Sequence, residues 1–242
     1  GLESLPVLKL EKLNLNCCRE LTNEGLLQLL GKCSATLTVL NLSSTTISGE
    51  GLESLPVLKL ETLNLSSCYS LTNAGLLLLL GKCSTTLKDL ILDCSIKSGE
   101  GLASVPDLKL ERLSLQSCYD LTNIAILQFL GKCSATLKDL NLSGNKISGE
   151  GLESLSVLKL EKLNLNSCRK LTNAGLLELL GKCSAMLADF NLSETTISGE
   201  GLEGLPVLKL EKLNLSSCFW LTNAGLLLLL GKCSSTLKDL IL

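Results

Sequence analysis

The sequence predicts an α/β solenoid, a right-handed coil of strand–helix units stacked around one continuous core. Three observations carry this prediction. The 242 residues fall into almost five copies of one 50-residue block, and each block holds two shorter units with the same leucine spacing. A fixed period of this kind is typical of solenoids and arrays. Apolar residues make up 45% of the chain but aromatic residues only 2%, which favours many thin leucine layers over one large globular core.

Each unit begins with a strand signal. The first unit reads Leu10-x-x-Leu13-x-Leu15-x-x-Cys18. Because side chains alternate along a strand, Leu13 and Leu15 should point into the core and Lys12 should point outward. Ten unit starts alternate between 27 and 23 residues apart: Leu10, Leu37, Leu60, Leu87, Leu110, Leu137, Leu160, Leu187, Leu210 and Leu237. We expect about ten parallel strands on the concave side of a single array that spans residues 1–242.

The segment after the first strand of each block changes to helical spacing. In LTNEGLLQLLGKC, residues 21–33, apolar side chains fall at i, i+3, i+4 and i+7 on one face. Thr22 or Asn23 can cap the start of this helix, and Gly31 suits its end. The shorter unit has room only for a turn or two of helix around residues 51–55. The convex helices should therefore alternate between long and short.

Two segments depart from the repeat. Ile124-Ala125-Ile126 replaces the Ala-Gly-Leu of three other blocks, so we expect the third long helix to start differently. Ser95-Ile96-Lys97 inverts the order of Asn145-Lys146-Ile147 and places Lys97 in an apolar position. This inversion predicts a local distortion of the loop.

Ten of the twelve cysteines occupy positions locked to the repeat. They either end the first strand of a block or close its long helix: Cys18, Cys68, Cys118, Cys168 and Cys218, then Cys33, Cys83, Cys133, Cys183 and Cys233. Copies on alternate strands lie about 10 Å apart, too far for a disulfide. We expect buried thiols that pack as small apolar side chains. Cys17 and Cys94 break the pattern and should be partly exposed and free, with either a reactive role or none.

Composition excludes several kinds of chemistry. The chain has no histidine and a formal net charge of -2. Histidine-dependent catalysis and metal binding are thus impossible, and the basic excess of a general nucleic-acid binder is missing. Carboxylates and serines recur in every block without a base or an obvious pocket. We expect no enzyme activity, cofactor, metal, nucleic acid or membrane insertion.

The segment Cys18-Arg-Glu-Leu-Thr-Asn-Glu-Gly-Leu, followed by Cys33 and the next leucine strand, resembles the cysteine-containing subclass of leucine-rich repeats. That subclass is best known in F-box substrate receptors of ubiquitin ligases. The alternation of longer and shorter units is similar to the ribonuclease-inhibitor type, which innate immune receptors also use. The resemblance implies a leucine-rich repeat horseshoe but says little about function, because fold alone does not determine function.

One dipeptide differs between blocks more than any other position. It follows the strand-ending cysteine, in the loop that leaves the carboxyl end of each strand, and we call the five copies the ridge. The ridge residues are Arg19, Glu20, Tyr69, Ser70, Tyr119, Asp120, Arg169, Lys170, Phe219 and Trp220. Four of the six aromatic residues lie there, which is what a recognition surface needs. Neutral drift of an unconstrained loop is the alternative.

The outward positions of the strands form a column in which basic and acidic residues alternate along much of the sheet. Its charged members include Lys12, Asp89, Arg112, Asp139, Lys162, Asp189 and Lys212. Opposite charges on adjacent strands stabilise each other by about 0.2–1 kcal/mol per pair. The column is either a self-neutralised ladder or a docking surface for a partner with a matching charge pattern.

These features predict a protein-recognition scaffold that binds a protein ligand through the ridge, helped by the concave sheet. The alternative is a structural protein that assembles head to tail, because neither end carries a polar cap. We expect the chain to be a fragment of a longer array. Asn-Leu-Ser sequons lie on the predicted concave sheet, where glycans would cover the binding face, so an intracellular location is favoured: Asn41, Asn64, Asn141, Asn191 and Asn214.

Overall fold

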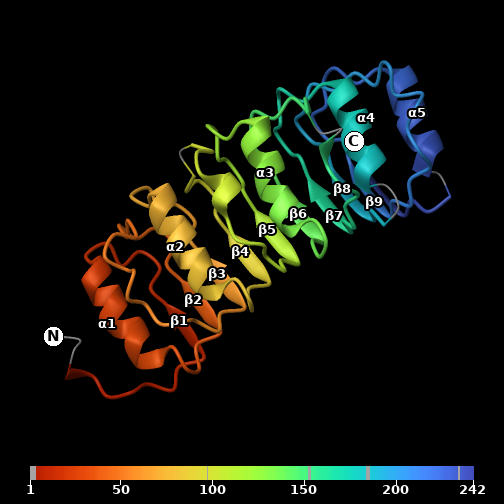
Figure 1. Cartoon of the computed structure of the whole chain (residues 1–242). Helices are drawn as coiled ribbons and strands as arrows, with labels where there is room; N and C mark the ends of the chain where they lie inside the picture. The colour runs from red at the N-terminus through yellow and green to blue at the C-terminus, as the bar shows by residue number, and fades with distance from the viewer. Residues whose placement is uncertain (1–3, 97, 152–153, 184–185, 234) are drawn as a thin grey trace.

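The computed structural model shows one elongated array of strands with a row of helices beside them (Figure 1). It describes residues 4–96, 98–151, 154–183, 186–233 and 235–242. Ten strands of three residues pair in parallel in one sheet, in chain order from β1 to β10. The strands are β1 (Lys12–Asn14), β2 (Val39–Asn41), β3 (Thr62–Asn64), β4 (Asp89–Ile91), β5 (Arg112–Ser114), β6 (Asp139–Asn141), β7 (Lys162–Asn164), β8 (Asp189–Asn191), β9 (Lys212–Asn214) and β10 (Asp239–Ile241). This is the expected α/β solenoid.

Strand register places equivalent residues side by side along the whole array. Leu63 of β3 is aligned with Leu40 of β2 on one side and Leu90 of β4 on the other, and all three side chains are buried. Thr62 and Asn64 flank Leu63 on the outward face and are partly exposed. The period-2 prediction of inward leucines is therefore confirmed, and the core is a continuous stack of leucine layers.

The long helices follow the odd-numbered strands. They are α1 (Asn23–Cys33), α2 (Asn73–Cys83), α3 (Asn123–Cys133), α4 (Asn173–Cys183) and α5 (Asn223–Cys233). Thr22 caps α1, because its hydroxyl oxygen accepts a hydrogen bond from the backbone N–H of Gly25 at 3.0 Å. Asn23, the other candidate cap, instead donates from its side-chain amide to the Ser48 hydroxyl at 2.8 Å. Asn23 thus ties the helix to the turn of the next unit.

One expectation about the helix ends was wrong. Gly31 does not end α1, because the helix continues to Cys33 and Ser34 caps it with an ordinary right-handed φ of -56°. Among the described residues the short units hold at most one turn of helix, as expected: residues 53–54 form a turn, and the third block has a three-residue 3-10 helix, η2 (Leu102–Ser104). Pro56 gives a physical reason, since a proline disfavours the helical conformation of the residue before it.

A close approach between two glycines joins a short-unit turn to the next long helix at three places in the array. Gly49 has φ +92° and packs against Gly75 in α2, where an added Cβ would lie 2.2 Å from the Ser48 carbonyl oxygen. The fourth and fifth long helices repeat this contact. In the third block Ala125 occupies the helix position, and the facing Gly99 lacks the positive φ of Gly49.

The two irregular segments meet at this contact. The expectation that the third long helix starts differently was wrong, because α3 begins at Asn123 with the same threonine cap. The facing loop is rearranged instead: Ile96 is only 6% exposed, whereas the equivalent Thr46 and Lys146 are exposed. Ile96 therefore fills the apolar position that Ile47 fills in the first block. Lys97 lies outside the described residues.

All twelve cysteines are free, and eight of them are buried as predicted. Cys68 donates its thiol proton to the carbonyl oxygen of Leu42, in the preceding unit, at 3.0 Å. Cys18 was expected to be buried but is exposed, because it follows β1, the edge strand of the described sheet. Cys218 is half-buried. Cys17 is exposed and Cys94 half-buried, as expected.

Burial also makes the core thiols poor acids. It raises the pKa of three helix-closing thiols from 9.0 to about 12: Cys83, Cys133 and Cys183. The described residues contain no cluster of metal-ligating side chains that could hold an ion. Among the described helices, none combines the length and the apolar character needed to cross a membrane.

Candidate protein-binding surfaces

The ridge turns of the first four blocks are held by the same backbone hydrogen bond to the next unit. The backbone amide of Ser67, just before the strand-ending Cys68, donates to the Asp93 carbonyl oxygen of the next unit at 2.7 Å. Asn64 accepts a hydrogen bond from the Ser66 amide at 2.9 Å, and Ser67 then adopts a left-handed φ of 56°. An outward asparagine therefore holds the ridge turn in four blocks, and Asp93 of the preceding unit takes this role in the third, a structural role that the sequence did not reveal.

All ten ridge residues are exposed on these turns. Phe219 is 89% exposed and Trp220 is 69% exposed, and Tyr69 and Tyr119 each expose more than half of their surface. The two remaining aromatic residues, both phenylalanines, are buried in the core. Exposed aromatic side chains on a backbone held by hydrogen bonds to its neighbours are available to a partner with little loss of backbone freedom.

The structure brings the last part of the ridge together around a pocket of about 360 Å³. Arg169 of the fourth block faces Phe219 and Trp220 of the fifth across it, with Glu194 and Thr196 from the unit between them. The sequence did not identify Glu194 or Thr196 as part of the site. The other ridge residues lie on their own turns, outside the lining of this pocket: Arg19, Glu20, Tyr69, Ser70, Tyr119, Asp120 and Lys170.

Glu194 forms an ion pair with Arg169 at this pocket. Its carboxylate lies 3.1 Å from the Arg169 guanidinium and accepts a hydrogen bond from the Ser167 hydroxyl at 3.0 Å. These hydrogen bonds, first from Ser167 and then from Arg169, lower the pKa of Glu194. The carbonyl oxygen of Arg169 accepts a further hydrogen bond from Thr196 at 3.2 Å. Arg169 is therefore oriented beside the exposed aromatic pair.

The charged column on the outward sheet face is aligned as predicted. Arg112 is in register between Asp89 and Asp139, and it forms an ion pair with Asp89. Asp139 has a raised pKa, chiefly because it is partly buried, while the nearby cations Lys162 and Arg112 act in the opposite direction. The residues around Arg112 line a shallow depression of about 440 Å³. Lys162, Asp189 and Lys212 continue the alternation on β7, β8 and β9.

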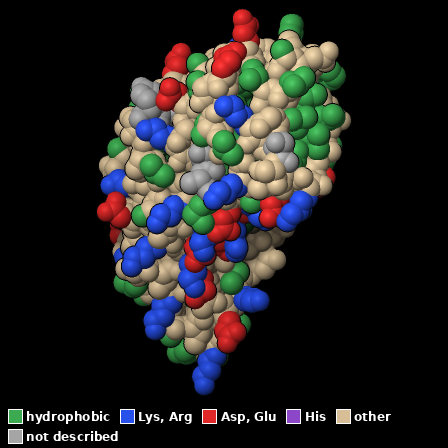
Figure 2. Space-filling model, turned by 90° about the vertical axis from the view of Figure 1, so that its right-hand side faces the viewer, with side chains coloured by type: hydrophobic (Ala, Val, Ile, Leu, Met, Phe, Trp, Pro, Cys, Tyr) green, Lys and Arg blue, Asp and Glu red, His purple; other side chains and the backbone are tan. Residues whose placement is uncertain are grey.

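The second charged column consists of exposed ion pairs across neighbouring strands. Lys88 lies 3.2 Å from Glu61, Lys138 lies 3.4 Å from Glu111, and Lys238 lies 3.1 Å from Glu211. Basic and acidic side chains are intermingled across the lower half of the face shown in Figure 2. Pairs as exposed as these contribute little to stability, because solvent screens them.

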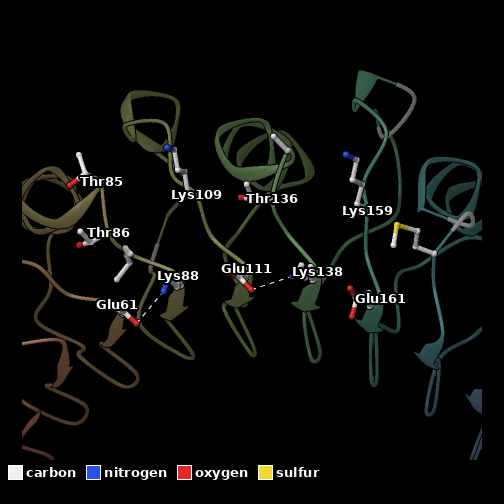
Figure 3. Close-up of a pocket in the computed structure, with 13 residues that line it drawn as sticks. Glu61, Thr85, Thr86, Lys88, Lys109, Glu111, Thr136, Lys138, Lys159 and Glu161 are labelled. Atoms are coloured by element: carbon white, nitrogen blue, oxygen red, sulfur yellow. Dashed lines mark hydrogen bonds and ion pairs between the residues drawn. The ribbon is translucent and has the colours of Figure 1, made fainter.

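Sequence reasoning missed a groove at the opposite edge of the sheet, where the strands begin. The groove has a volume of about 670 Å³ and runs across three blocks. Lys109 and Lys159 lie on one side of it, and the Glu61–Lys88 and Glu111–Lys138 pairs lie on the other (Figure 3). We call it the strand-start groove. Its signal in the sequence was a double departure from the repeat, at residues 186 and 188.

Repeated parallel strands, stacked helices and one shared leucine core define the class of protein: an α/β solenoid repeat protein. The Leucine Rich repeat family model matches residues 8–30, 33–55, 133–156 and 158–180. The four matched segments are leucine-rich repeats, and the rest of the chain repeats their leucine spacing.

Other comparisons add little to this assignment. The crystal structure of the Rad7 and Elc1 complex in yeast contains a similar chain, at 17% identity and a TM-score of 0.37. The similarity covers 93% of the present chain and 80% of that chain. A search of curated proteins found no match.

Proposed function

We propose that this protein is a recognition scaffold that binds a protein ligand through the ridge. The observation that carries the proposal is the coincidence of variation and exposure. The backbone is nearly the same in every block, yet the ridge dipeptide differs in each one, and all ten of its side chains are exposed. A folding constraint would preserve these positions, as it preserves the leucines, whereas selection for a ligand varies them.

The chemistry of the ridge suits a protein partner. Tyrosine, tryptophan and arginine are the residues that most often dominate the binding energy of protein interfaces. Adjacent ridge turns lie two strands apart, so the five turns extend over about 40 Å. A ridge of that length is long enough for a standard-sized interface, in which each partner buries ~800 Å². The pocket between Arg169 and Phe219 supplies a concave site for one anchoring side chain.

The sheet face contributes to specificity in this proposal. The alternation of Asp89, Arg112 and Asp139 presents a fixed order of charges. A partner with the reverse order pairs with it, and a partner in the wrong register meets like charges. Such complementarity affects selectivity and association rate more than affinity. In this proposal the ridge provides most of the binding affinity, and the sheet face discriminates between partners.

A site-specific cross-linking experiment tests the proposal. A photoreactive phenylalanine analogue replaces Trp220 in one variant and Val207, which is similarly exposed but lies away from the ridge, in another. Both proteins are irradiated in an extract of the source cells, and cross-linked partners are identified by mass spectrometry. We expect one partner to be captured from position 220 and not from position 207. Equal capture from both positions, or capture from neither, would contradict the proposal.

A second candidate function is head-to-tail self-association, which the outer edge of β10 favours. Leu240, Ile241 and Leu242 are exposed there. Figure 2 looks onto this end of the array and shows hydrophobic side chains gathered at its upper right. An unpaired edge strand is a template for pairing with another chain. Light scattering on the 242-residue chain distinguishes the candidates: a monomer at all concentrations excludes self-association, and a mass that rises with concentration supports it.

A further inference from the structure

The strand-start groove has two walls of different character. One wall is the row of Glu–Lys ion pairs at the beginnings of the strands, and Lys109 and Lys159 project from the loops that form the other (Figure 3). Thr86 and Thr136 lie between the walls. Their hydroxyls are already used, because each donates to a leucine carbonyl oxygen of the preceding unit at 2.7 Å. The floor is therefore predominantly apolar, and the charges of the groove lie at its walls.

The fourth block departs from the repeat at the end of this groove. Met186 replaces the threonine found at the equivalent position of every other block, and its side chain is 51% exposed. Two residues later, Ala188 replaces the lysine that pairs with glutamate in three other blocks. Glu161, on the strand beside Ala188, therefore lacks the partner that Glu61 has. Both changes lie at the same end of the groove. Met186 adds an exposed apolar side chain there, and Ala188 leaves the carboxylate of Glu161 without the lysine partner of three other blocks.

Lys109 and Lys159 provide the complementary charge. Both are exposed, and neither forms an ion pair within the part of the chain that the structure describes. They occupy the same position in consecutive blocks, so they lie two strands, or about 10 Å, apart. A peptide extended in the polyproline II conformation rises ~3.1 Å per residue with three residues per turn, so its positions i and i+3 lie on one face and cover this distance. The spacing of the two ammonium groups matches carboxylates at positions i and i+3 of an extended chain.

We propose that the strand-start groove binds an extended acidic peptide segment of a partner protein. Two carboxylates, three residues apart, pair with Lys109 and Lys159. An apolar side chain beyond them packs on Met186, whose flexible thioether adapts to different shapes. Glu161 accepts a hydrogen bond from a backbone N–H or a basic side chain of the peptide. The groove lies at the opposite edge of the sheet from the ridge, so this inference holds or fails independently of the proposed function.

Fluorescence anisotropy with a designed peptide series tests the inference. Each fluorescein-labelled peptide carries two glutamates in a serine background, placed two, three, four or five positions apart, followed by one leucine. We expect the peptide with glutamates three positions apart to bind most tightly. The K109A/K159A double variant should bind it about tenfold more weakly, because two ion pairs are lost. Replacing the leucine by serine should weaken binding to the natural chain but not to M186T.

Matched controls separate this site from general charge attraction. Lys9 and Lys209 occupy the equivalent positions in the first and fifth blocks and are also exposed, but they do not line the groove. The K9A/K209A variant has the same net charge as K109A/K159A and should bind the peptide like the natural chain. Equal weakening in both double variants, no dependence on glutamate spacing, or no peptide that binds more tightly than an all-serine control would each overturn the inference. Circular dichroism of every variant confirms that the fold is retained.

Discussion

The contact between Gly49 and Gly75 allows a sharp test of how the units are joined. A Cβ added at Gly75 would lie 2.2 Å from the Ser48 carbonyl oxygen and 2.7 Å from the Gly49 Cα. Both are backbone atoms, so no side-chain rotation relieves the clash, and the turn must move away from α2. That movement also disturbs the hydrogen bond from the Thr72 amide to the Ser48 oxygen, which is 3.1 Å long.

The magnitude of the effect follows from three contributions. Overpacking costs about 1–3 kcal/mol, and a weakened hydrogen bond costs about 1 kcal/mol more. Alanine in place of glycine within a helix stabilises the folded state by about 1 kcal/mol. Gly75→Ala should therefore lower the free energy of unfolding by about 2 kcal/mol. Gly81, in the same helix, has nothing within 4 Å of an added Cβ, so Gly81→Ala should raise it by about 0.5–1 kcal/mol.

Urea unfolding followed by far-ultraviolet circular dichroism measures both variants. The two substitutions are chemically identical and lie in one helix, so the difference between them isolates the contact with the neighbouring turn. We expect the midpoints to shift in opposite directions. A Gly75→Ala protein as stable as Gly81→Ala would refute the conclusion that this contact joins the units.

The cysteines lead to two further predictions. Above pH 9 the thiols of the unfolded chain lose their protons, whereas the buried helix-closing thiols of the folded chain keep theirs up to about pH 12. The free energy of unfolding should therefore fall as the pH rises from 9 to about 12, by up to about 1.4 kcal/mol per thiol and pH unit. Replacing Cys83, Cys133 and Cys183 by alanine should flatten this dependence in urea titrations; an unchanged slope would argue against it. In the folded protein at pH 8, Ellman's reagent should modify exposed Cys17 quickly and half-buried Cys94 more slowly, and Cys83 only after unfolding. Labelling of Cys83 as fast as of Cys17 would contradict the buried assignment.

Much of the fold could be predicted because each unit repeats the same physical requirement. Leu63 is buried between Leu40 and Leu90 because alternation in a strand and stacking of units both require it. The threonine cap was one of two open alternatives, and only the contact of Asn23 with Ser48 in the next unit decides between them. Local sequence predicts the elements, whereas contacts between units decide such choices.

The remaining features depend on which residues the stacking brings together. Arg169 and Phe219 are 50 residues apart in sequence, and the pocket between them exists only because Glu194 lies on the intervening unit. Ala125 looked like a change at the start of a helix, but the structural adjustment occurred in the facing loop around Ile96. Met186 replaces a threonine of the repeat, and the structure places it beside the groove. In each of these cases, the sequence of a single block does not contain the residue that makes the contact.

The affinity of a purified partner for ridge variants tests the central claim most directly. Surface plasmon resonance would compare the natural chain, the F219A/W220A variant and a V157A/V207A control whose valines are similarly exposed. Truncation of two aromatic anchors at about 2 kcal/mol each should raise the Kd by about a hundredfold or more, while the control should stay within about twofold. A Kd that F219A/W220A leaves unchanged, for a partner that binds the natural chain, would contradict recognition through the ridge.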